Sequence, residues 1–125
     1  MSSGLFSHMF YIYVLRLEGN KYYVGKAADP HSRFEKHVNG KGARWTKRYH
    51  PLEMIETYET DNPFDEDKTT KEYMGKYGID NVRGGTYVKK KIDNTTREFL
   101  QREIWMALGK CTECGGSHLS RFCDH

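Results

Sequence analysis

FYIYVLRL at residues 10–17 and KYYVGK at residues 21–26, joined by EGN at 18–20, decide the fold of this chain. Both flanking segments are rich in β-branched and aromatic residues, a composition that favours strands. The short polar connection contains glycine and asparagine, which favour a turn. The sequence therefore predicts a β-hairpin.

The length of the turn decides which side chains share a face of this hairpin. With a three-residue loop, Tyr13 lies opposite Gly25 and Leu15 lies opposite Tyr23. Because side chains alternate between faces along a strand, Tyr13 and Tyr23 would then be diagonal neighbours on one face. A two-residue loop would put the two phenols on opposite faces. A function that uses both hydroxyls requires the three-residue loop.

Downstream of the hairpin, Pro30 suits the first turn of a helix and Gly40 a C-terminal stop, so a helix is predicted over 30–39. Phe34 and Val38, one helical turn apart, would form its buried stripe. The elements expected after it are a basic loop at 41–50, a strand at 51–58, a helix at 68–77, a turn at 81–85, a basic strand or arm at 86–92, and a helix with Leu100, Ile104 and Leu108 facing inward. This order predicts an α/β (α+β) fold, in which a small antiparallel three-stranded sheet is flanked by helices.

The chain has 125 residues, the length of one domain with a small appendage. We expect a disordered or tag-like start at 1–9, a main domain at 10–92, a connecting helix at 93–110 and a separate tail at 111–125. The start lacks the basic and apolar regions of a secretory signal, and no apolar run is long enough to span a membrane. The clustered, odd number of cysteines fits a metal site and an intracellular location, cytoplasmic or nuclear.

The net charge of +3 is mild, but it is unevenly distributed. Residues 21–50 contain eight Lys or Arg and two acidic residues, whereas residues 51–72 contain eight acidic residues and two lysines. The basic segment would attract a polyanion such as nucleic acid, and the acidic segment beside it would attract a metal ion. A solvated surface of mixed charge is the alternative.

Several residues have the chemistry that cleavage of a phosphodiester bond requires. Tyr13 and Tyr23 provide hydroxyls that would act as bases if nearby cations lower a phenol pKa of about 10. Arg33 has a planar guanidinium that matches phosphate geometry, and Lys26 adds a second cation. His37, one helical turn after Arg33, would relay a proton or hold the phosphate.

YIY at 11–13, YVGKA at 23–27 and Arg33 together resemble the core signature of the GIY-YIG nuclease family, over about residues 10–82. NGKGARWT at 39–46 also resembles the loop after the family's first helix. The resemblance implies a nuclease that uses Tyr13, Tyr23, Arg33 and one divalent metal ion, Mg²⁺ or Mn²⁺. The first triplet departs from the family pattern because tyrosine replaces its leading glycine.

The resemblance also implies a metal-binding glutamate on the helix after the third strand. If the apolar pair at 73–74 corresponds to the family's pair, the glutamate position falls on Thr70, which has no carboxylate. Asp67 or Glu66, one turn earlier, is expected to bind the metal, with Glu72 as the second choice. If none of them reaches the site, the fold would bind nucleic acid without cutting it.

A basic stretch around a tryptophan is predicted to bind nucleic acid through Arg44, Trp45, Lys47 and Arg48. Trp45 would stack on a base or sugar, while packing in the core is the alternative.

The tail contains Cys111, Cys114, His118 and Cys123, a spacing that can surround a tetrahedral zinc ion. It resembles a retroviral-type zinc knuckle, with Gly115 after the second cysteine but three residues, instead of four, before the histidine. Such a knuckle would bind single-stranded nucleic acid. A disordered tail with free cysteines is the alternative.

The sequence thus predicts a metal-dependent endonuclease that hydrolyses phosphodiester bonds in DNA, with catalytic Mg²⁺ or Mn²⁺ and structural Zn²⁺. A non-catalytic nucleic-acid-binding module on a GIY-YIG fold is the alternative. DNA is the expected partner ahead of RNA, no membrane partner is expected, and the sequence leaves the oligomeric state open.

Overall fold

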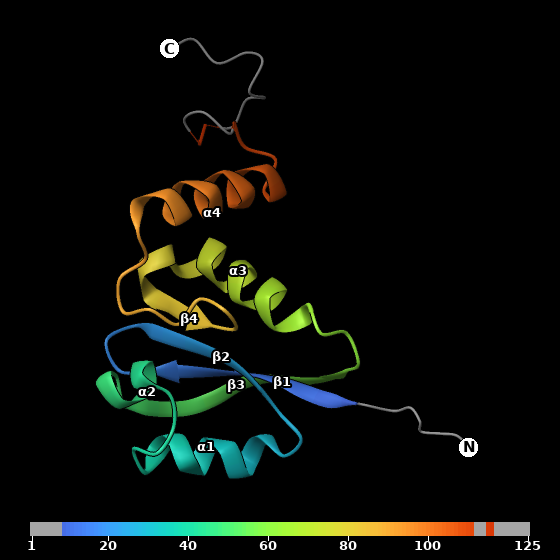
Figure 1. The fold of residues 1–125 in the computed structure, drawn as a ribbon, viewed down its shortest axis with the longest axis vertical. Helices are drawn as coiled ribbons and strands as arrows, with labels where there is room; N and C mark the ends of the chain where they lie inside the picture. The colour runs from blue at the N-terminus through green and yellow to red at the C-terminus, as the bar shows by residue number, and fades with distance from the viewer. Residues whose placement is uncertain (1–8, 112–114, 117–125) are drawn as a thin grey trace, which may run out of the picture.

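The structure is a computed structural model that describes residues 9–111 and 115–116. Its elements along the chain are β1 (Phe10–Leu17), β2 (Lys21–Ala27), α1 (Pro30–Val38), α2 (Arg44–Arg48), β3 (Pro51–Thr60), α3 (Asp65–Tyr77), the 3₁₀ turn η1 (Ile79–Asn81), β4 (Val82–Gly84) and α4 (Asn94–Ala107). The strands form one sheet in the order β3-β1-β2-β4. Helices lie on both faces of this sheet, with α1 on one side and α3 on the other (Figure 1).

The hairpin of β1 and β2 has the predicted three-residue loop. Tyr13 lies opposite Gly25, and Leu15 lies opposite Tyr23. Gly19 and Asn20 adopt positive φ values of 75° and 59° in the turn, a conformation that these two residue types tolerate best. The register prediction is confirmed, and it puts Tyr13 and Tyr23 on the same face.

The prediction of three antiparallel strands is wrong, because the sheet has a fourth strand. β4 pairs in parallel with β2, Tyr22 opposite Val82 and Val24 opposite Gly84. The sequence favoured a turn at 81–85 because of its glycines, and a basic strand at 86–92. The strand instead forms at 82–84, where the preceding 3₁₀ turn returns the chain to the open edge of β2.

Two further boundaries differ from the prediction. The basic segment at 41–50 contains the short helix α2, and α3 begins at Asp65, three residues before the expected start. The acidic residues in the first turn of α3 favour this earlier start because they complement the helix dipole.

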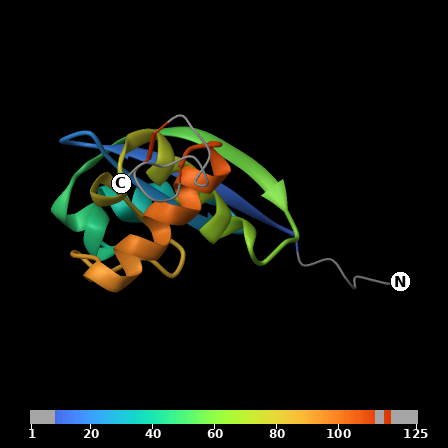
Figure 2. The same cartoon turned by 90° about the horizontal axis from the view of Figure 1, so that it is seen from above.

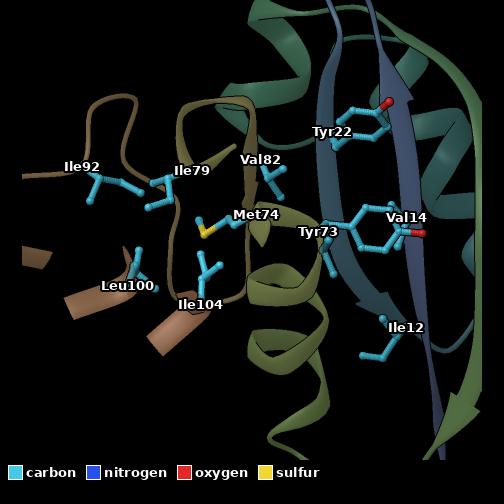
Figure 3. Close-up of a cluster of buried hydrophobic side chains, with 11 residues drawn as sticks. Ile12, Val14, Tyr22, Tyr73, Met74, Ile79, Val82, Ile92, Leu100 and Ile104 are labelled. Carbon is cyan, nitrogen blue, oxygen red and sulfur yellow. The ribbon is translucent and has the colours of Figure 1, made fainter. Parts of the chain in front are cut away.

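The two faces of the sheet are covered by separate cores. On one face, Ile12, Val14 and Val24 belong to a cluster that includes Met74 of α3 and Leu100 of α4. Figure 3 shows this cluster between the sheet, α3 and α4. Helix α4 lies outside α3 and crosses it, as Figures 1 and 2 together show, so this side has two helical layers.

The opposite face carries the cluster of Tyr13, Leu15, Leu17, Ala27 and Trp45. The alternation along β1 therefore divides its side chains between the two cores.

Two expectations about buried helical positions are wrong. Val38 of α1 and Leu108 after α4 are exposed, whereas His37 is 2% exposed. Helix α1 therefore directs His37 inward together with the partly buried Phe34, in place of Val38. None of the helices in the described part of the chain is long and apolar enough to cross a membrane.

Candidate functional site

Two tyrosines and a histidine from three elements meet on the α1 side of the sheet. The ring centroids of Tyr13 on β1 and Tyr23 on β2 are 6.4 Å apart. The ring of His37 on α1 lies 5.9 Å from the Tyr13 ring and 5.0 Å from the Tyr23 ring. The hairpin register and the helix thus bring together three of the predicted site residues.

Hydrogen bonds in this group define the tautomer of His37. The Thr46 hydroxyl donates to the Ala43 carbonyl at 2.9 Å, so its oxygen is left to accept from His37 Nδ1 at 2.8 Å. His37 Nε2 then carries no proton in the neutral ring and accepts from the Tyr13 hydroxyl at 2.8 Å. The result is a buried chain of directed hydrogen bonds from Tyr13 to the backbone at Ala43.

Thr46 was not among the predicted site residues. It is buried, and it comes from the segment whose sequence resembles the loop after the first family helix. No local pattern singles it out, because its contact with His37 depends on how α2 packs against α1.

Glycines pack closely against both members of the Tyr13–His37 pair. A Cβ on Gly25 would lie 2.5 Å from Tyr13 Cζ, and a Cβ on Gly42 would lie 2.6 Å from His37 Cε1. Real Cβ atoms essentially never come this close to another heavy atom. The absence of a side chain at these two positions therefore allows the pair to sit where it does.

Burial controls the protonation of the three rings. It raises the pKa of Tyr13 and of Tyr23 above the ordinary phenol value, and the nearby Arg33 opposes this only in part. Burial, assisted by Arg33, lowers the pKa of His37 to about 4. The condition that cations lower the phenol pKa is thus not met, and both tyrosines and the histidine are neutral near pH 7.

Glu66 is the predicted carboxylate that shares an electrostatic environment with the tyrosines. It raises the pKa of Tyr13 and Tyr23. Burial raises the pKa of Glu66 itself, while Lys26 and Arg33 lower it. Arg33 and Glu66 are therefore close enough to the two phenols to act on their charge, and Lys26 acts on Glu66.

The other predicted metal ligands make different contacts. Asp67 accepts hydrogen bonds from the backbone N–H of Thr86 at 2.8 Å and from its hydroxyl at 3.0 Å. Glu72 is exposed and lines a different cavity, between α3 and α4. Thr70 is fully buried, and its hydroxyl donates to the Glu66 carbonyl at 2.7 Å. The family position assigned to Thr70 from the sequence thus faces the core, one turn away from Glu66.

The predicted nucleic-acid-binding stretch divides between core and surface. Trp45 is 4% exposed and its Nε1 donates to the Tyr22 carbonyl at 2.9 Å. The core alternative therefore holds for Trp45, which cannot stack on a base without leaving this position. Arg44 and Arg48 are exposed and line a cavity that reaches Tyr23, whereas Lys47 is exposed outside that cavity.

Of the predicted zinc ligands, Cys111 lies within the described residues, where it is buried. Cys114, His118 and Cys123 lie outside them. The backbone N–H of Cys111 donates to the Gly116 carbonyl, and the N–H of Gly115 donates to the Cys111 carbonyl, both at 2.8 Å. Within 9–111 and 115–116, no group of three or more His, Cys, Asp or Glu side chains could hold a metal ion.

Comparison with known proteins gives several partial matches. UPF0213 protein SERP0126 of Staphylococcus epidermidis is 40% identical over 52 residues, covering 40% of this chain and 63% of that protein. UPF0213 protein YazA of Bacillus subtilis is 41% identical over 49 residues, covering 39% of this chain and 48% of that protein. UPF0213 protein BH0048 of Halalkalibacterium halodurans is 29% identical over 94 residues, covering 70% of this chain and 93% of that protein.

The matched segments thus span less than two thirds of the S. epidermidis and B. subtilis proteins. No solved structure gives a significant match. The family model of the GIY-YIG catalytic domain matches residues 9–78, which contain the paired tyrosines, Arg33, His37 and Glu66. Because this match covers more than half of the chain, the chain belongs to the GIY-YIG family.

Proposed function

We propose that this chain is a metal-dependent endonuclease that hydrolyses phosphodiester bonds in DNA. The observation that carries the proposal is the close packing of Tyr13, Tyr23 and His37 in a GIY-YIG fold, with the charges of Arg33 and Glu66 acting on both phenols. Together they provide the hydroxyls, the proton acceptor, the guanidinium and the carboxylate that such a cleavage requires.

Glu66 is the residue that would hold Mg²⁺ or Mn²⁺. Its carboxylate is half-buried with a raised pKa, so a bound cation would stabilise the charged form. A single carboxylate is sufficient, because Mg²⁺ commonly retains several waters and binds substrate phosphate oxygens. When bound, the metal would neutralise charge on the phosphate and on the leaving oxygen. Thr86 donates to both oxygens of Asp67, whereas Glu66 is the carboxylate whose charge acts on both phenols, so Glu66 is the preferred ligand.

The two phenols have different roles in this proposal. Tyr13 is fully buried and donates to His37, whereas Tyr23 is partly exposed. Tyr23 would therefore orient the attacking water through its neutral hydroxyl. Tyr13 and His37, whose rings pack against Tyr23, would fix the position of the Tyr23 ring. Arg33 is exposed and would bind the phosphate, with Lys26 adding a second positive charge.

A plasmid-nicking assay with and without Mg²⁺ or Mn²⁺ tests the proposal. Arg33→Ala is expected to reduce cleavage by about 100-fold or more while weakening DNA binding only modestly, since one transition-state contact is lost. Glu66→Gln should remove the metal-dependent cleavage, and Glu72→Gln serves as the matched control on the same helix. Equal rates for Glu66→Gln and Glu72→Gln would refute the role of Glu66.

A non-catalytic nucleic-acid-binding module is the second candidate. The raised pKa values of both phenols favour it, because neither tyrosine is then a ready base. Oligonucleotide binding without added Mg²⁺ or Mn²⁺, together with no nicking by the parent chain in either metal, would select this candidate.

We also propose that Cys111, Cys114, His118 and Cys123 bind a structural zinc ion. The buried Cys111 and its backbone hydrogen bonds to Gly115 and Gly116 support this, because they fix the position of the first ligand. Measurement of one zinc per chain, lost in Cys111→Ser, would test it. A tail deletion that leaves nucleic-acid affinity unchanged would instead favour a tail that contacts protein.

A further inference from the structure

A basic cavity begins beside Tyr23 and extends away from the candidate site. Its volume is about 690 Å³, within the usual range for ligand sites, and it is open on one side. Its charged rim consists of Arg44 and Arg48 from α2, with Lys89 and Lys90 from the loop after β4. The family match ends at residue 78, so half of this rim lies outside it.

A buried guanidinium fixes the loop that carries the two lysines. Arg83 is 1% exposed, and its side chain donates to the Lys89 carbonyl at 2.6 Å and to the Lys90 carbonyl at 3.0 Å. It also donates to the carbonyls of Ile79 at 2.6 Å and Val82 at 2.7 Å. The loop is thus fastened to the end of the sheet by charge-assisted hydrogen bonds.

Arg83 also forms part of the wall of the cavity. Its guanidinium lies 4.7 Å from the centroid of the Trp45 ring. The four carbonyls that it binds carry no net charge, so its positive charge adds to that of the rim.

The rim cations are not used in ion pairs between described residues. Those ion pairs are Arg16–Glu53, Lys71–Glu103 and Arg97–Asp80, and none of these residues lines the cavity. The cavity lining contains no acidic side chain. Its charged groups thus suit an anion, while the exposed Val88 offers an apolar surface beside them.

We propose that this cavity binds a single-stranded segment of nucleic acid adjoining the phosphate that the chain cleaves. The proposal rests on the nuclease function above and adds a second contact region to it. Phosphates would bind the rim formed by Arg44, Arg48, Lys89 and Lys90, and a base or sugar would contact Val88. A concave basic groove of limited volume fits one strand, whereas a duplex presents its phosphates on a broad convex surface.

Salt-dependent binding in buffer without Mg²⁺ or Mn²⁺, and without a chelator, tests this in the absence of cleavage. The probe is a fluorescein-labelled 12-nucleotide single strand, compared with the same sequence as a duplex, and the readout is fluorescence anisotropy over a range of KCl concentrations. The double variant Arg44→Ala/Lys90→Ala removes one cation from each side of the cavity. The control Lys36→Ala/Lys110→Ala removes the same charge from exposed positions that do not line it.

Loss of two phosphate contacts should reduce the slope of log K against log salt by about 1.4 for the single strand. We expect more than a tenfold loss of single-strand affinity in the cavity variant and a smaller change in the control. An equal effect of the two variants, or a loss confined to the duplex, would overturn the proposal. Because omission of Mg²⁺ and Mn²⁺ prevents cleavage, an inactive parent chain that still shows this difference would refute only the nuclease function.

Discussion

Gly25→Ala should displace Tyr13 and so break the Tyr13–His37 hydrogen bond. The added Cβ would lie 2.5 Å from Tyr13 Cζ and 2.9 Å from Cε2, whereas ordinary van der Waals contacts are 3.4–4 Å. The phenol ring must therefore move by about 1 Å. Tyr13 is fully buried among Leu15, Leu17 and Trp45, which leaves no free space for that movement.

The expected cost follows from overpacking a closed core. Inserting one methyl group into such a position typically costs about 1–3 kcal/mol of folding stability. A shift of about 1 Å in a catalytic group can reduce the rate by about 100-fold. The 2.8 Å hydrogen bond to His37 would be broken or strongly bent by the same shift.

Three measurements check this prediction. Urea denaturation gives the loss of stability, and plasmid nicking gives the loss of rate at equal concentrations of folded protein. Titration of the His37 ring by NMR provides a readout that does not depend on activity. The pKa of His37 is about 4 because the ring is buried, and it should move towards about 6.5 when Tyr13 no longer covers it.

Gly109→Ala is the matched control. Gly109 has a φ of +72° and no neighbour within 4 Å of an added Cβ, so alanine there adds backbone strain without touching the site. It should cost about 1–2 kcal/mol and leave both the nicking rate and the His37 pKa unchanged. If Gly25→Ala kept the parent rate and a His37 pKa near 4, the close packing of Tyr13 on Gly25 would be refuted.

Three other predictions follow from the buried polar groups and the tail. The pKa of His37 is about 4 in the folded chain and about 6.5 when unfolded, so protonation favours unfolding. The free energy of unfolding should therefore fall as pH falls through this window, by up to about 3 kcal/mol, and urea titrations of His37→Gln should lack that contribution. A lysine at position 83 cannot reproduce the four hydrogen bonds of the guanidinium, so Arg83→Lys should lower the free energy of unfolding by about 2–4 kcal/mol. The same variant should speed tryptic cleavage after Lys89. Unchanged proteolysis would argue against the anchoring of this loop. Removal of zinc by a chelator should lower single-strand affinity but leave the thermal unfolding of the main domain nearly unchanged, as followed by circular dichroism.

The hairpin shows what local sequence determines. The alternation along residues 10–17, the three-residue turn and the second strand are properties of neighbouring residues, and they fix Tyr13 and Tyr23 on one face. The start of α1 at Pro30 follows from its N-terminal signals for the same reason. This part of the candidate site could be predicted because the chain specifies it over short distances.

Contacts between distant residues decided the rest. Glu66 and Asp67 are adjacent on α3 and both contact the turn after β4, Glu66 at Gly85 and Asp67 at Thr86, but Glu66 is the carboxylate whose charge acts on both phenols. The buried position of His37 and its bond to Thr46 depend on the docking of α1 and α2, and β4 forms only because β2 offers an open edge. Sequence periodicity shows which side of a helix is buried, but that side spans an arc of about 100° or more. Tertiary packing therefore decides which of two adjacent carboxylates enters the site.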